Sequence, residues 1–72
     1  MEPITVRPYL AADQRPLERL AALDEGRVPP QPVVVAEAGG RLVAALSKRT
    51  GEAVADPFEP TAHLVAMLRV TP

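Results

Sequence analysis

The stretch 32–47, PVVVAEAGGRLVAALS, decides the fold. It contains two apolar runs, 33–38 and 42–47, that lie on either side of Gly39 and Gly40. A two-residue glycine turn between strand-like runs is typical of a β-hairpin, because both central positions of the favoured turn require a positive φ. The stretch therefore predicts two antiparallel strands joined by a tight turn near the middle of the chain.

The residues before this hairpin predict one strand and one helix. Residues 4–10, ITVRPYL, alternate apolar and polar side chains as a strand does, and Pro8 should either end the regular pairing of that strand or place it at an edge. A helix is expected next, with Asp13 as its N-cap and Gly26 at its end. Its apolar stripe consists of Leu17, Leu20, Ala21 and Leu23. The prolines of RVPPQP, 27–32, then predict an extended connection to the hairpin.

The residues after the hairpin predict a further strand and a second helix. Residues 52–56, EAVAD, follow a turn and indicate a short antiparallel strand. Residues 60–70, PTAHLVAMLRV, predict a helix that is capped by Asp56 or by Thr61. The resulting order is β-α-β-β-β-α. We expect an α+β fold in one domain, 1–72, with a mixed or antiparallel sheet and helices packed on it.

The composition excludes several classes of function. The chain has 72 residues, no cysteine and one histidine, so we expect no disulfide, no structural zinc site and no other metal site. The formal net charge is −1 and no basic stripe is present, which argues against a nucleic-acid partner. No segment reads as a secretion signal or a membrane span, so we expect a cytoplasmic protein. Arginine outnumbers lysine seven to one, which is typical of a bacterial genome rich in G and C.

Three stretches resemble the N-terminal half of the GNAT superfamily of acyl-CoA-dependent N-acetyltransferases. ITVRPYLAAD, 4–13, with the leucine-rich helix after it, is similar to the opening strand and first helix of that family. VVVAEAGGRLVAALS, 33–47, resembles its second and third strands, and GEAVADPF, 51–58, lies where its fourth strand would be. The resemblance covers nearly the whole chain and implies a truncated GNAT-like fold without the later strands.

The resemblance also implies where a cofactor would bind. In the family, a glycine-rich loop and a helix N-terminus follow the fourth strand and bind the pyrophosphate of acetyl-CoA through free amides. The corresponding stretch here, DPFEPTAHL, 56–64, has no glycine and no arginine. Asp56 and Glu59 repel phosphate, and Pro57 and Pro60 lack an N–H donor. We therefore expect no cofactor site and no catalytic residue.

These departures favour a non-catalytic, GNAT-derived interaction module. The alternative is a small acyl-CoA-binding protein or N-acetyltransferase, whose acetyl-CoA site is completed by dimerisation or by a missing C-terminal half. His63 is the only side chain that ordinarily titrates near neutral pH, and Asp56 or Glu59 would be its partner in an acid–base role. We favour a surface histidine and two acids that satisfy amides at the start of the helix.

A partner chain is expected because so short a chain buries only about 60% of its unfolded surface. In a truncated fold the strand 51–56 becomes an exposed edge, which invites pairing with another chain. We expect a homodimer, or a complex with another protein, through this edge and one face of the last helix. Phe58 is expected to plug the core, with an exposed anchor for a partner as the alternative. The predicted interface residues are Val54, Phe58, Leu64, Met67 and Leu68.

Overall fold

The computed structural model describes residues 3–72, which form one antiparallel sheet and two α-helices. The elements in chain order are β1 (Ile4–Pro8), a 3-10 turn (Ala11–Asp13), α1 (Gln14–Leu23), β2 (Val33–Ala38), β3 (Arg41–Ser47), β4 (Ala53–Ala55) and α2 (Ala62–Val70). The strands lie in the order β1-β2-β3-β4, and each neighbouring pair is antiparallel. The predicted α+β class and the order β-α-β-β-β-α are confirmed.

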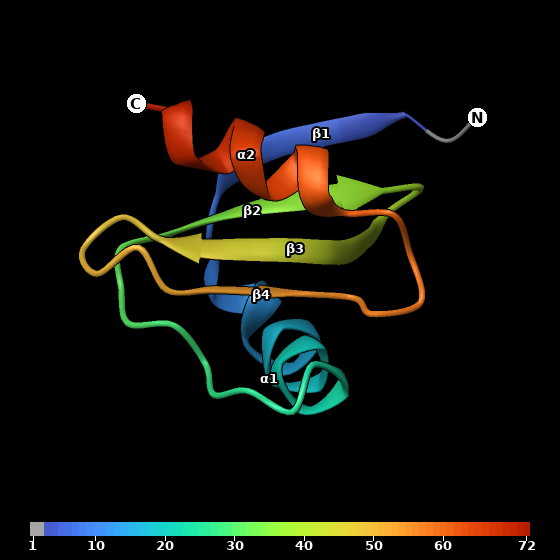
Figure 1. Cartoon of the computed structure of the whole chain (residues 1–72). Helices are drawn as coiled ribbons and strands as arrows, with labels where there is room; N and C mark the ends of the chain where they lie inside the picture. The colour runs from blue at the N-terminus through green and yellow to red at the C-terminus, as the bar shows by residue number, and fades with distance from the viewer. Residues whose placement is uncertain (1–2) are drawn as a thin grey trace.

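The two helices cover opposite faces of the sheet (Figure 1). Side chains along β2 alternate between these faces, as the two-residue period of a strand requires. Val33 and Val35 point toward α1, whereas Val34 and Ala36 point toward α2. Burial on both faces explains why β2 and β3 read as continuous apolar runs in the sequence.

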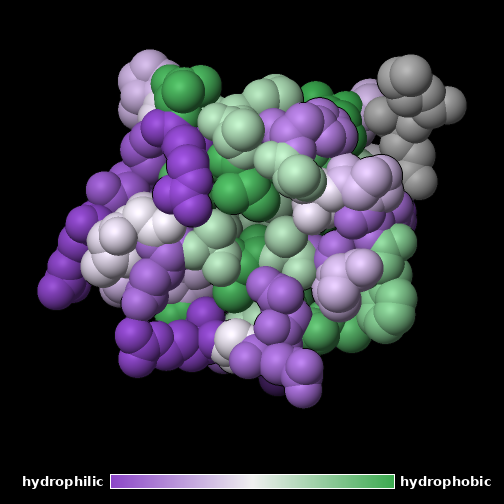
Figure 2. Space-filling model, in the orientation of Figure 1, coloured by the Kyte–Doolittle hydropathy of each residue, from purple (hydrophilic) through white to green (hydrophobic). Residues whose placement is uncertain are grey.

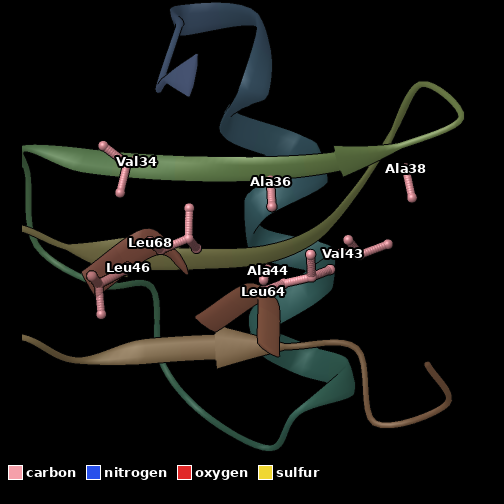
Figure 3. Packing of buried hydrophobic residues seen from close by; sticks show 8 residues of the cluster. All are labelled: Val34, Ala36, Ala38, Val43, Ala44, Leu46, Leu64 and Leu68. Carbon is pink, nitrogen blue, oxygen red and sulfur yellow. The ribbon is translucent and has the colours of Figure 1, made fainter. Parts of the chain in front are cut away.

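Each helix closes a separate apolar cluster. The cluster under α2 consists of Val34, Ala36, Ala38, Val43, Ala44, Leu46, Leu64 and Leu68 (Figure 3). The cluster under α1 consists of Leu17, Leu20, Ala21, Val33, Val35, Ala45 and Val54. Alanines occupy central positions of the sheet in both clusters, so each cluster contains few large side chains.

The central hairpin has the predicted geometry. Gly39 and Gly40 have φ values of 59° and 85°, and Ala38 pairs with Arg41 across the turn. Both values lie in the left-handed region, which residues other than glycine reach only at a cost. The glycine pair therefore fixes the register that aligns β2 with β3.

Helix α1 ends in a way that the sequence did not indicate. The residue with a positive φ is Glu25, at 51°, rather than Gly26. The Gly26 amide donates to Ala21 O at 2.9 Å and the Glu25 amide donates to Ala22 O at 3.2 Å, which is the Schellman arrangement. Gly26 lies close to β4, and a Cβ there would make a tight contact of 3.3 Å with Val54 Cγ1.

The expectation that Phe58 plugs the core is wrong, because its residue surface is 82% exposed. Asp56 Oδ1 accepts a hydrogen bond from the Phe58 amide at 2.8 Å, and the Glu59 amide donates to Asp56 O at 3.2 Å. These bonds form a tight turn that points the phenyl ring into solvent. Thr61, one of the two predicted caps, occupies the N-cap position of α2, although its side chain makes no capping bond.

Candidate interaction surface

Strand β1 forms one edge of the sheet. The Tyr9 amide donates to Val33 O at 2.9 Å and the Gly39 amide donates to Pro3 O at 3.4 Å. Because backbone polar groups alternate in direction along a strand, these bonds place the odd-numbered residues of β1 toward β2. The amides of Ile4 and Val6 therefore point away from the sheet, and within residues 3–72 they donate to no acceptor.

Pro8 occupies the last outward position of β1. A proline at this position removes no hydrogen bond from the ladder, which confirms the edge placement predicted for the strand. Its carbonyl oxygen accepts a hydrogen bond from Arg7 Nη1 at 3.1 Å. The unpaired part of the edge is thus confined to Ile4 and Val6.

Arg7 is the centre of an ion network on the α1 face of the sheet. Its guanidinium binds Asp13 in a two-pronged manner, with Nη1–Oδ2 at 2.7 Å and Nη2–Oδ1 at 2.9 Å, and its Nε donates to Glu37 Oε1 at 2.8 Å. Asp13 is only 6% exposed and also accepts a hydrogen bond from the Leu10 amide at 2.7 Å. The network ties β1 to β2 and to the 3-10 turn.

The charges of this network perturb one another. The hydrogen bonds from the Arg7 guanidinium lower the pKa of Asp13 below its ordinary value, and burial opposes that shift only in part. The two carboxylates raise the pKa of Arg7 above its already high value, so the guanidinium stays charged throughout the accessible pH range. Asp13 occupies the predicted N-cap position of α1, but its carboxylate makes no capping bond to that helix and instead holds the 3-10 turn and the arginine.

The opposite edge, β4, is shorter and partly covered. Bonds from the Ser47 amide to Glu52 O and from the Asp56 amide to Val43 O place the outward amides at Ala53 and Ala55. The Ala55 amide donates to Asp24 Oδ2 at 3.1 Å. The turn that follows α1 therefore occupies one of the two amides that another strand would need at this edge.

Three of the five predicted interface residues are buried in the interior of the domain. Val54 packs under α1, and Leu64 and Leu68 pack under α2, each at most 4% exposed. Only Phe58 and Met67 expose substantial surface. A contact between these two side chains and a partner remains a prediction, but the five residues do not form one continuous surface.

In the view of Figure 2, apolar surface runs down the middle of the molecule, between polar residues on either side. At the start of α2 a hollow of about 370 Å³ is present. Its lining consists of Ile4, Ala38, Arg41, Val43, Glu59, Pro60, Thr61, His63 and Leu64. Arg41 Nη2 binds Glu59 Oε1 at 2.6 Å beside this hollow.

His63 is exposed on the lining of this hollow, as the interpretation of a surface histidine requires. The carboxylates near it in sequence are engaged elsewhere: Glu59 binds Arg41, and Asp56 holds the Phe58 amide. The structure therefore does not join His63 to either acid in a hydrogen-bonded pair. Lys48 donates to the carbonyl oxygens of Leu68 and Thr71 at the end of α2.

Within residues 3–72, no three side chains of histidine, cysteine, aspartate or glutamate are grouped as a metal site would require. Neither helix in this part of the chain combines the length and apolar character needed to cross a bilayer. The chain matches no protein-family model, no curated protein and no solved structure.

Proposed function

We propose that this protein is a non-catalytic interaction module that associates with a second copy of itself. The observation that carries the proposal is the edge of β1, where the amides of Ile4 and Val6 have no acceptor within the described residues. An unpaired strand edge is a template for pairing with another chain. Association gives these main-chain groups partners and covers Ile4, which is 42% exposed.

The size of the core supports the need for a partner. Ala36, Ala44 and Ala45 occupy central positions of the sheet with no exposed surface, and each contributes only one methyl group to the core. Small domains without disulfides or metals commonly gain stability from oligomerisation. Because this alanine-rich core makes few apolar contacts, a second chain would supply additional ones.

The GNAT resemblance supplies the proposed origin of the module. The antiparallel order of four strands, with one helix after the first strand and another after the fourth, is compatible with a truncated member of that family. Asp56 and Glu59 are bonded within the chain at the position where the family would bind pyrophosphate. This part of the proposal rests on resemblance, and fold analogy alone does not define an activity.

Sedimentation velocity from low-micromolar to near-millimolar concentration tests the self-association. We expect the sedimentation coefficient to rise from that of a 7.7 kDa monomer toward that of a dimer. A folded monomer over the whole range would contradict the proposal.

One observation favours the alternative of acyl-CoA binding. The first amides of α2 lack a side-chain cap and lie beside the apolar hollow, so an anionic group with an apolar extension has both kinds of contact available. Isothermal calorimetry with acetyl-CoA and with CoA separates the two functions. The interaction module predicts no binding tighter than millimolar, whereas sub-millimolar binding of either ligand would favour the alternative.

A further inference from the structure

The two edges of the sheet differ in their readiness to accept another strand. At β4 the Asp24 carboxylate already occupies the Ala55 amide. Edge strands are usually protected by lysine, by proline or by a covering segment. On β1 the only such protection is Pro8, at the end of the strand, and the only charged side chain, Arg7, is engaged with Asp13 and Glu37.

Pro8 restricts how two β1 strands can pair around a two-fold axis. With the axis at Thr5, Ile4 lies opposite the partner's Val6, and each pair exchanges two hydrogen bonds, which gives four in total. With the axis at Val6, four bonds also form, but Ile4 lies opposite the partner's Pro8, which has no N–H, so the Ile4 carbonyl oxygen is left without a donor. With the axis at Ile4, the described residues supply only two bonds. The register centred on Thr5 therefore satisfies all the outward groups of Ile4 and Val6.

The side chains agree with the same register. Ile4 and Val6 pair with Ala38 and Ala36 and lie on the α2 face, so each would meet an apolar residue of the partner strand. On the α1 face the two Thr5 side chains would lie opposite each other without like charges. The formal net charge of −1 per chain adds little repulsion between the copies.

From these observations, and resting on the proposed self-association, we propose that two copies pair β1 with β1 about a two-fold axis at Thr5. The product is a continuous eight-stranded antiparallel sheet. The partner is thus a second copy of this chain, and it binds at the β1 edge rather than at the β4 edge or the exposed side of α2.

A single-cysteine variant tests this register directly, because the chain contains no cysteine. In a pair that is not hydrogen-bonded, opposite Cα atoms lie about 4.5 Å apart, within the span of a disulfide. We expect Thr5→Cys to form a disulfide-linked dimer under mild oxidation and to keep the wild-type fold by circular dichroism. Met67→Cys, on the exposed side of α2, is the matched control and is expected to remain largely monomeric under the same conditions.

A second pair of variants isolates the main-chain hydrogen bonds. Ile4→Pro removes two of the four bonds and should weaken dimerisation about tenfold or more, whereas Ile4→Ala keeps the amide and should weaken it less. If wild type is a dimer but Thr5→Cys links no better than Met67→Cys, or Ile4→Pro dimerises as well as Ile4→Ala, the β1 register is overturned while the proposed function stands. If wild type is a monomer throughout the concentration range, both proposals fall.

Discussion

Replacing Arg7 by methionine removes the centre of the ion network while keeping an apolar stem of similar length. The change eliminates three charge-assisted hydrogen bonds, two to Asp13 and one to Glu37, at 2.7, 2.9 and 2.8 Å. Asp13 then keeps only the bond from the Leu10 amide and remains almost fully buried. An unpaired buried carboxylate is strongly unfavourable, so Arg7→Met is expected to destabilise the fold.

The size of the effect follows from the burial of the pair. Breaking a fully buried ion pair costs about 3–5 kcal/mol. The Arg7 side chain is 24% exposed, so water screens part of the interaction, and we expect a loss of about 2–3 kcal/mol. For a domain of this size that loss corresponds to a decrease in Tm of about 10–20 °C. Arg7→Lys, which keeps the charge but loses the two-pronged contact, should give an intermediate value.

The pH dependence of the unfolding free energy tests whether the lost stability comes from the charged Asp13 carboxylate. Because the native pKa of Asp13 is lowered, its stabilising contribution is present above the unfolded-state pKa and disappears as pH falls through the native pKa. The difference in unfolding free energy between wild type and Arg7→Met should therefore be largest near neutral pH and should narrow in acid.

Thermal unfolding followed by circular dichroism between neutral pH and strong acid measures both effects. Arg27→Met is the matched control, because its bond to Glu52 is also 2.8 Å long but the Arg27 side chain is 85% exposed, so its Tm should stay near that of wild type. The reasoning is refuted if Arg7→Met melts within a few degrees of wild type, or if its deficit is the same at all pH values.

Three further substitutions, with Val70→Ala as a control for one of them, probe the helices. Glu25→Gly relieves the positive φ at the end of α1 and should raise the unfolding free energy by about 0.5–1 kcal/mol in urea titrations; a decrease would contradict the assigned strain. Lys48→Met removes the ammonium group from the C-terminal carbonyls of α2 and should speed amide exchange in its last turn, and unchanged exchange would contradict the capping role. Leu68→Ala should cost about 2–5 kcal/mol, whereas Val70→Ala on the exposed side should be nearly neutral; equal effects would contradict the packing of α2.

The fold was predictable from local patterns because its decisive features are local. The Gly39-Gly40 turn sets the hairpin, and continuous apolar runs on both sides identify strands that are covered on both faces. Pro8 indicated an edge strand, and the structure places it at an outward position. Each of these signals depends on residues close together in the chain, so the sequence alone contained them.

The surface of the molecule was less predictable because it depends on residues far apart in the chain. Asp24 reaches the Ala55 amide across 31 residues, and Arg7 reaches Glu37 across 30. The contact of Asp24 covers the β4 edge of the sheet. The contact of Arg7 pairs the charged side chain of β1 with a carboxylate. Phe58 is favoured as a core residue over an exposed anchor by the sequence, whereas the turn held by Asp56 directs its side chain outward.

Amide hydrogen exchange as a function of protein concentration tests the self-association at β1 most directly. The account predicts that the Ile4 and Val6 amides exchange freely in dilute solution and become protected as the dimer forms. The Thr5 and Arg7 amides, which face β2, should be protected at every concentration because their partners lie within the chain. If the Ile4 and Val6 amides remain unprotected at concentrations where sedimentation shows a dimer, the pairing of β1 with β1 is contradicted.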